Sequence, residues 1–232
     1  MSSAVVIPAA GLGLRLGGEI PKAFREVGGD SLLVHAVRGL KAAAAADLVC
    51  FVVAVPPGAE EAVTKELEPY VGDARLLVVA GGAERPDSVR AALDVLPEAG
   101  IDCILVHDAA RAFVPVDAIE RVVAAVRAGA AAVVPVVPVT DTIKVVGPDG
   151  AVVDTPDRST LVAVQTPQGF APGVLRRAHA VGADAGVTDD AMMCERMGVT
   201  VQTVDGSPDA FKVTRPQDLL LAAALLAERG LR

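Results

Sequence analysis

Hydrophobic residues along the chain follow two alternating patterns, which together predict a parallel β-sheet covered by helices. Short runs rich in Val, Ile and Leu, typical of buried strands, alternate with stretches in which Ala and Leu recur at helical spacing. Strands are expected at 4–8, 48–55, 75–80, 101–107 and 130–137. Helices are expected from about Ser31, over about 58–68, 86–96 and 115–127, and from about Pro216 to Glu228. We therefore expect an α/β fold, with a Rossmann-like, mostly parallel sheet and helices on both faces.

The stretch from about 138 to 164 departs from this alternation. It is rich in Thr, Asp, Pro and Gly, and two short alternating segments, at 142–146 and 151–153, flank the turn signal at 148–150. This pattern predicts a β-hairpin arm that protrudes from the main sheet. Because such an arm cannot bury its apolar side alone, we expect it to pack on a second copy in a homodimer. The chain, 1–232, is otherwise expected to form a single domain.

The first predicted strand ends in a glycine-rich loop followed by two cationic residues. Gly11 and Gly13 lack a Cβ, so their backbone can approach phosphate oxygens, and Arg15 and Lys22 would supply positive charge. A dinucleotide-binding loop is excluded because Leu16 stands where its third glycine is required. A P-loop is excluded because Gly-Lys-Ser/Thr is absent. The loop therefore indicates a phosphate site of another kind, or else an ordinary strand–helix turn with two solvated cations.

Composition and charge limit the possible partners. The net charge of −8 argues against a nucleic-acid or membrane surface, so locally clustered Arg and Lys must hold any anionic substrate. Cys50, Cys103 and Cys194 are far apart in the chain, and we expect buried free thiols in a reducing compartment. No charged-then-apolar leader and no apolar run of about 18 residues is present. We therefore expect a cytoplasmic protein with no membrane or nucleic-acid partner.

Polar residues follow the third and fourth predicted strands, where ligands of open α/β sheets bind. Gly81 and Gly82 could let the backbone approach a flat base, and Ser88 offers a hydroxyl, although two glycines before a helix also form an ordinary turn. Asp108 follows the fourth strand, where a carboxylate could hold magnesium or ribose hydroxyls, or could simply cap a helix. His107 is expected to be packed and hydrogen-bonded.

Four later loops carry polar residues beside proline or apolar anchors, at 155–158, 165–168, 187–190 and 211–216. Taken singly, each has an ordinary explanation. Surface Arg and Lys are usually solvated, and an acidic pair such as Asp189-Asp190 is typical of a helix N-terminus. Their value lies in occurring together.

The ordered set of motifs resembles the 2-C-methyl-D-erythritol 4-phosphate cytidylyltransferases of the non-mevalonate isoprenoid pathway. The opening glycine loop alone marks only the wider sugar-nucleotidyltransferase superfamily. The more specific motifs are Gly-Gly-x-Glu-Arg-x-x-Ser-Val at 81–89, Val-His-Asp-Ala-Ala-Arg at 106–111, Asp-Thr-Ile-Lys at 141–144, Asp-Arg at 157–158, Thr-Pro-Gln at 166–168 and Lys-Val-Thr at 212–214. The resemblance runs through nearly the whole chain. Ala83 and Pro156 depart from residues found in some relatives, but neither removes a charge.

The resemblance implies a nucleotidyltransferase that moves the cytidylyl group of CTP to 2-C-methyl-D-erythritol 4-phosphate, releasing pyrophosphate, with Mg²⁺ or another divalent cation. Residues matching the family's catalytic positions are Arg15, Lys22, Arg158 and Lys212. Those matching its nucleotide-binding positions are Ala9, Ala10, Gly11, Gly13, Gly82, Ser88, Asp108 and Ala109, with Asp108 also the candidate metal ligand. Those matching its acceptor-binding positions are Arg111, Thr142, Thr166 and Thr188. Arg111 and Thr142 would reach the site from the partner subunit's arm.

Two alternatives stay open at this stage. Ribitol-5-phosphate cytidylyltransferases, which make CDP-ribitol, share this fold and most of these motifs, so the polyol phosphate that accepts the cytidylyl group could differ. A non-catalytic nucleotide-binding module or an NAD-dependent oxidoreductase is the other alternative. The missing third glycine and missing ribose-binding acid argue against NAD. A module without catalysis would have little reason to keep Arg15, Lys22, Asp108, Arg158 and Lys212 all at strand or loop ends.

Overall fold

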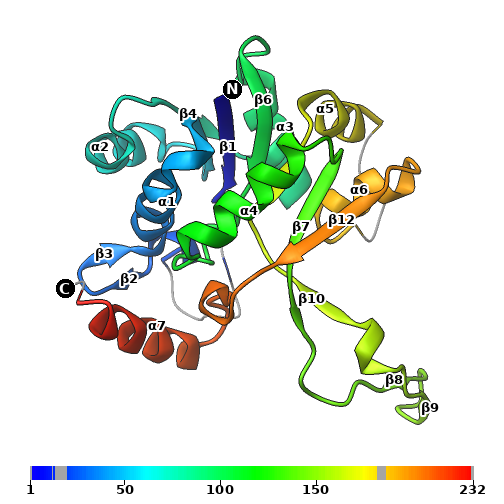
Figure 1. Cartoon of the computed structure of the whole chain (residues 1–232). Coiled ribbons are helices and arrows are strands. Elements are labelled where there is room, and N and C mark those ends of the chain that lie inside the picture. Colours follow the sequence, from blue (N-terminus) through cyan, green and yellow to red (C-terminus); the bar gives the residue numbers. More distant parts are fainter. Residues whose placement is uncertain (1, 12, 14–19, 182–186, 231–232) are drawn as a thin grey trace.

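A large mixed β-sheet forms the centre of the computed structural model, which describes residues 2–11, 13, 20–181 and 187–230 (Figure 1). The strands of this sheet are β1 (Ser2–Pro8), β4 (Leu48–Val55), β5 (Arg75–Ala80), β6 (Ile101–Val106), β7 (Ala132–Pro138), β10 (Val162–Val164), β11 (Gln168–Phe170) and β12 (Val201–Asp205). Their order is β10-β7-β11-β6-β1-β4-β5, and β12 pairs with β7. The central strand β1 runs parallel to both β4 and β6. The sheet is therefore mostly parallel, as predicted.

Helices cover both faces of this sheet (Figure 1). On one face lie α1 (Leu32–Ala42), α2 (Glu60–Val71) and α4 (Val116–Arg127), and on the other α3 (Arg85–Val95), α5 (Pro172–Val181) and α6 (Asp190–Arg196). Along β1, Val5 and Ile7 pack on the first face, whereas Ala4 and Val6 pack on the second. Because both faces are buried, the strand is a continuous apolar run rather than an alternating one.

A smaller apolar cluster joins the C-terminal helix α7 (Pro216–Glu228) to a two-stranded hairpin, β2 (Glu26–Val27) and β3 (Asp30–Ser31). Val27, Phe113 and Leu226 are buried in this cluster. The predicted bounds of α7 are confirmed. Its position beside the hairpin holds the preceding loop, which carries Lys212, against the main domain (Figure 1).

The predicted strands and helices are confirmed with small shifts at their ends, the largest at α2, which begins at Glu60 and ends at Val71. The prediction missed α5, α6, β11 and β12. Strand β11 lies between β6 and β7 and is antiparallel to both. It is only three residues long, which is too short for a periodic signal.

The predicted arm is present as a hairpin of β8 (Val145–Val146) and β9 (Val152–Asp154), which projects from the sheet at the lower right of Figure 1. The predicted start of the arm, at about 138, agrees with the end of β7 at Pro138, whereas its predicted end lies too late because residues 162–164 form β10. Strand β10 pairs antiparallel with the outer end of β7. The arm proper is therefore shorter than 138–164.

None of the helices in the described parts of the chain is long and apolar enough to cross a membrane. Cys50, Cys103 and Cys194 are buried and unbridged, as the sequence predicted. Burial raises the pKa of the Cys103 thiol to about 12, so this group stays protonated and unreactive.

Candidate active site

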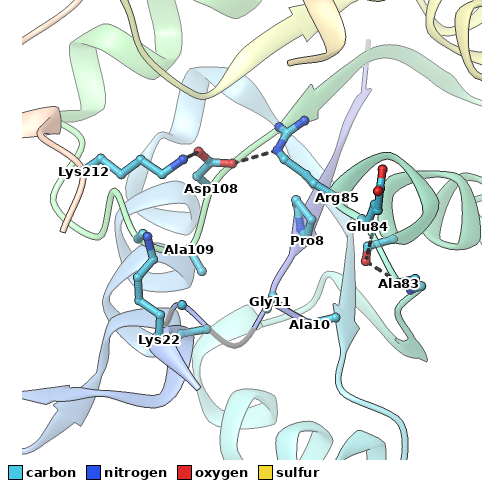
Figure 2. A pocket seen from close by; sticks show the side chains of 16 residues that line it. Pro8, Ala10, Gly11, Lys22, Ala83, Glu84, Arg85, Asp108, Ala109 and Lys212 are labelled. Carbon is cyan, nitrogen blue, oxygen red and sulfur yellow. Dashed lines mark hydrogen bonds and ion pairs between the residues drawn. The ribbon is translucent and has the colours of Figure 1, made fainter. Parts of the chain in front are cut away.

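A cleft of about 310 Å³ opens at the carboxyl ends of β1, β5 and β6. This is where the topology of a parallel sheet gathers the loops that can bind a ligand. Its volume lies at the lower end of the ~300–1,000 Å³ typical of small-molecule sites. The residues of the sequence prediction that line it are Ala9, Ala10, Gly11, Gly13, Lys22, Gly82, Ser88, Asp108, Ala109 and Lys212. Three separate loops and the segment before α7 therefore converge here, as Figure 2 shows.

The glycine loop after β1 lies directly against Lys22. Gly13 has a φ of +64°, and a Cβ at this position would clash with the Cβ of Lys22. Only glycine fits both this conformation and this contact. Pro21 is extended and precedes a single 3₁₀ turn over Lys22–Phe24, so α1 begins only at Leu32. This arrangement directs Lys22 into the cleft. Arg15 lies outside the described residues.

The second glycine loop is fixed by the start of α3. The Gly82 N–H donates to Ser88 Oγ at 3.2 Å, and Ser88 Oγ donates to the Glu84 carbonyl at 3.3 Å. A Cβ on Gly82 would clash with the Cβ of Asp87, so no side chain fits there. The buried Ser88 hydroxyl therefore holds the backbone of this loop in place. At Gly82 the loop therefore presents main chain to the cleft.

Asp108 lies between two cations. Its Oδ1 accepts from Arg85 Nε at 3.2 Å and its Oδ2 from Lys212 Nζ at 2.6 Å, and Figure 2 shows both partners reaching the carboxylate. Burial alone would raise the pKa of Asp108, but Arg85 and Lys212 outweigh it and hold the pKa well below its usual value. The carboxylate is therefore ionised at neutral pH. It does not cap α4, which begins eight residues later at Val116, so the capping alternative is wrong.

Behind Arg85 lies a buried acidic residue that the sequence analysis did not assign to the site. Arg85 Nη1 donates to Asp190 Oδ2 at 2.7 Å, and Asp190 Oδ1 lies 2.9 Å from His179 Nε2. The neighbouring Asp189 caps α6 as expected, accepting from the Met192 N–H. Two features of the sequence pointed to these residues. Arg85 is the arginine of the Gly-Gly-x-Glu-Arg motif, and Asp190 is the second acid beside the helix cap. His179 contacts Asp190 and is not among the described residues that line the cleft.

The backbone of Asp108 is hydrogen-bonded to Thr166, which in turn contacts His107. The Asp108 N–H donates to Thr166 Oγ1 at 3.0 Å, and this hydroxyl lies 3.2 Å from His107 Nδ1. Burial lowers the pKa of His107 to about 4, so its imidazole is neutral at physiological pH. The prediction that His107 is packed and hydrogen-bonded is confirmed. Thr166 acts at this position by orienting the backbone of Asp108.

Arg111 lies on the loop after β6 in the main domain, so the expectation that it reaches the site from the arm is wrong. It follows Asp108 by three residues in the same tight turn. Its guanidinium donates to the carbonyls of Ala210 at 2.7 Å and Val164 at 3.0 Å. Its Nε is buried without a hydrogen-bond partner among the described residues. Arg111 thus ties the base of β10 to the loop that carries Lys212.

Lys212 lines the cleft, but the other residues predicted to bind the acceptor are not among the described residues that do: Arg111, Thr142, Arg158, Thr166 and Thr188. Thr142 and Arg158 lie on the arm, where Arg158 Nη1 donates to the Thr140 carbonyl at 2.8 Å. Thr188 precedes α6, two residues before Asp190. The cleft of a single chain therefore contains the nucleotide half of the predicted site but only part of its acceptor half.

The surroundings of Asp108 could hold a divalent cation only together with phosphate oxygens of the substrate. No group of three or more His, Cys, Asp or Glu that could hold a metal occurs within residues 2–11, 13, 20–181 and 187–230. Mg²⁺, however, is commonly held by one or two carboxylates together with substrate phosphates. Asp108 is suited to that arrangement because it is ionised and lies in the cleft. A cation would have to arrive with a triphosphate.

The sequence is similar to known proteins over nearly its whole length. A family model described as 2-C-methyl-D-erythritol 4-phosphate cytidylyltransferase matches residues 3–228. Curated proteins of that name include one from Streptomyces coelicolor, 53% identical over 238 residues that cover 99% of this chain and 86% of that protein. Another, from Rhodococcus jostii, is 53% identical over 223 residues that cover 96% of this chain and 94% of that protein.

Solved structures show the same likeness in three dimensions. The 2-C-methyl-D-erythritol 4-phosphate cytidylyltransferase from Thermus thermophilus is 38% identical, with a TM-score of 0.78, and the match covers 98% of this chain and 100% of that one. The 4-diphosphocytidyl-2C-methyl-D-erythritol synthase from Anaerococcus prevotii is 26% identical, with a TM-score of 0.82 and coverage of 97% and 98%. The similarity thus extends over nearly the whole chain.

Proposed function

The chain belongs to the 2-C-methyl-D-erythritol 4-phosphate cytidylyltransferase family and transfers the cytidylyl group of CTP to that phosphate, and we propose that the transfer occurs by direct attack in the cleft at Asp108. A phosphate monoester has a second pKa of about 6, so the acceptor is mostly a dianion at neutral pH. Its oxygen forms a bond to the α-phosphorus of CTP while the bond to the β-phosphate breaks and pyrophosphate leaves. No general base and no covalent enzyme intermediate are required.

The observation that carries this mechanism is the gathering of cations in an acidic protein. Lys22, Arg85 and Lys212 all line one cleft, although the chain has a net charge of −8. Fixed positive charge at the place where negative charge develops is usually the largest catalytic contribution in such reactions. We assign Lys22, together with Arg15, to the α-phosphate and the leaving pyrophosphate.

The remaining roles follow from position in or near the cleft. The residues proposed to bind the nucleotide are Ala9, Ala10, Gly11, Gly13, Gly82, Ser88, Asp108 and Ala109. Lys212 and Arg158 are proposed to hold the acceptor phosphate, and Arg111, Thr142, Thr166 and Thr188 to complete its pocket. The unpartnered Nε of Arg111 supports a role for this residue in binding an anion.

We propose Mg²⁺ or another divalent cation as the cofactor, held by Asp108 and the triphosphate oxygens. When bound, such an ion neutralises the charge of the triphosphate and polarises its oxygens. Asp108 is the residue of this chain that would contact it. Arg85 and Lys212 keep this carboxylate deprotonated. Because both of its oxygens already accept from these two cations, a metal ion would have to share an oxygen with one of them or displace it.

We further propose that two chains form a homodimer through the arm. Val146, Val152 and Val153 on the hairpin are 58–64% exposed, which is unfavourable for valine in an isolated chain. Arg158 and Thr142 lie on this arm and away from the cleft of their own chain. We therefore propose that these two residues reach into the cleft of the partner chain. Location in the cytoplasm, without membrane or nucleic-acid partners, stays a prediction of the sequence.

Replacing Val153 with aspartate is expected to dissociate the dimer, because a charge cannot be buried in an apolar interface without a partner. The dimer dissociation constant should rise by roughly 100-fold, about 3 kcal/mol, measured by analytical ultracentrifugation. Val181→Asp is the matched control, since Val181 is 77% exposed but lies at the end of α5, away from the arm. A parent protein that is monomeric at micromolar concentration would contradict the proposed dimer.

The activity is tested by pyrophosphate release with CTP and Mg²⁺, using either 2-C-methyl-D-erythritol 4-phosphate or ribitol 5-phosphate as acceptor. We expect release with the first acceptor only. Equal or greater release with ribitol 5-phosphate would be consistent with the proposed mechanism but would contradict the assignment of 2-C-methyl-D-erythritol 4-phosphate as the acceptor. Absence of release with both, from a folded protein that binds CTP, would overturn the assignment of the cleft.

A further inference from the structure

A row of paired polar side chains continues from the cleft into the protein, from Lys212 and Arg85, which are 38% and 25% exposed, to Asp190, which is 1% exposed. Asp108 accepts from Lys212 and from Arg85, Arg85 donates to Asp190, and Asp190 lies 2.9 Å from His179 (Figure 2 shows the first three residues). Each residue comes from a different part of the chain, and Arg85 and Asp190 are 105 positions apart. The row therefore connects the nucleotide cleft with the segment that carries the acceptor residue Thr188.

Arg85 occupies the middle of this row and uses two different edges. Its Nε faces Asp108 at 3.2 Å and its Nη1 faces Asp190 at 2.7 Å. Because the guanidinium is planar and rigid, fixing Nη1 also fixes the direction of Nε. Asp190 thus determines how Arg85 meets the carboxylate in the cleft.

Asp190 is itself held in place. Its side chain is 1% exposed, and its second oxygen contacts His179. Burial alone would raise the pKa of Asp190, but Arg85 and His179 outweigh it and the pKa is lowered, so the carboxylate stays charged. A buried carboxylate with this pairing is costly to disturb, since loss of one partner leaves the other charge uncompensated.

We propose that Arg85 and Asp190 are positioning residues for cytidylyl transfer: Asp190 fixes the Arg85 guanidinium, which holds the Asp108 carboxylate in place and ties the Thr188 segment to the nucleotide cleft. Without Asp190, Arg85 turns toward Asp108 with more than one donor and displaces Lys212 from it. The Thr188 segment also loses its link to Arg85 and keeps its bonds to Gln168. Both changes misplace the groups that face the acceptor, whereas the backbone loops around the nucleotide are unaffected.

The test is the isosteric Asp190→Asn variant. We expect kcat to fall about 10- to 100-fold, as when a distant change misplaces reacting groups by about 1 Å. The KM for 2-C-methyl-D-erythritol 4-phosphate should rise several-fold, while the dissociation constant of CTP, measured by calorimetry, should stay within about threefold of the parent. This split between acceptor and nucleotide is not expected from a general loss of stability.

Asp189→Asn is the matched control because it removes the same charge one residue away. Asp189 does not contact Arg85: its Oδ1 accepts from the Met192 N–H, a cap that asparagine keeps, and its Oδ2 accepts from Gln168 Nε2, a bond that asparagine loses. Its kcat should remain close to that of the parent. A fall as large as that of Asp190→Asn would show that local charge or the α6 cap is responsible, and would overturn the proposal.

Arg85→Lys supplies a second, independent measurement should Asp190→Asn fold poorly. Lysine keeps the charge but cannot bridge two carboxylates with a planar fork, so kcat should fall similarly. In the double variant the two losses should overlap rather than multiply, because both break the same connection. A kcat of Arg85→Lys within about twofold of the parent, or fully multiplicative losses in the double variant, would overturn the proposal.

Discussion

Replacing Lys22 with alanine is expected to lower kcat about 10²–10³-fold, the usual effect of removing one electrostatic stabiliser of a transition state. Lys22 lines the cleft beside the glycine loop, where the α-phosphate and the leaving pyrophosphate are proposed to lie. Alanine keeps the Cβ that packs near Gly13, so the loop should retain its conformation. The loss should therefore appear in turnover rather than in folding.

The measurement is steady-state pyrophosphate release at saturating CTP and acceptor. Lys65→Ala is the control, since Lys65 is exposed on α2, away from the cleft, and pairs with the neighbouring Glu61; its kcat should be unchanged. Lys22→Arg should be more active than Lys22→Ala and less active than the parent, because arginine keeps the positive charge but not the geometry of the lysine side chain. Near-normal turnover of Lys22→Ala would contradict the proposed catalytic role of Lys22.

The position in the cleft of most residues proposed to bind the nucleotide could be predicted from the sequence, because topology determines it. An apolar run such as 4–8 predicts a buried parallel strand, and all such strands present their carboxyl ends at one edge of the sheet. Gly11, Gly82 and Asp108 follow three of these strands, so their meeting in one cleft follows from the fold class alone. The family motifs then distinguished CTP from other nucleotides.

The parts that could not be predicted depend on contacts between distant segments. The pairing of Arg85 with Asp190 has no local signal, because the Thr-Asp-Asp stretch is also what a helix N-terminus requires. The three residues of β11 are too few to show a strand period. Arg111 was assigned to the arm by resemblance, whereas its hydrogen bonds to Ala210 and Val164 place it in the main domain.

The acceptor half differs from the nucleotide half in one physical respect. Ala9, Gly82 and Asp108 belong to loops fixed by the sheet of their own chain, whereas Thr142 and Arg158 belong to an arm with few contacts to that sheet. A complete acceptor pocket therefore requires a second chain if the proposed dimer forms. Lys212 is the proposed acceptor residue whose position within a single chain is already fixed by an ion pair.

Lys212→Ala is expected to lower kcat/KM for 2-C-methyl-D-erythritol 4-phosphate about 10²–10³-fold, because the variant loses the cation proposed to hold the attacking phosphate. It also removes the 2.6 Å ion pair that lowers the pKa of Asp108, so the cleft becomes more negative toward an anionic acceptor. Arg85 still pairs with Asp108, and the CTP dissociation constant should therefore change much less than kcat/KM for the acceptor.

Lys41→Ala is the matched control for this variant, since it also breaks a Lys–Asp pair, with Asp73, and the two lysines have similar exposure, 32% and 38%. Because the Lys41 pair lies away from the cleft, kcat/KM should be unchanged. If Lys212→Ala weakened only CTP binding, Lys212 would be assigned to the nucleotide rather than to the acceptor. A loss confined to the acceptor would instead assign Lys212 to the attacking phosphate, which would have to approach the ammonium group where it pairs with Asp108 at 2.6 Å.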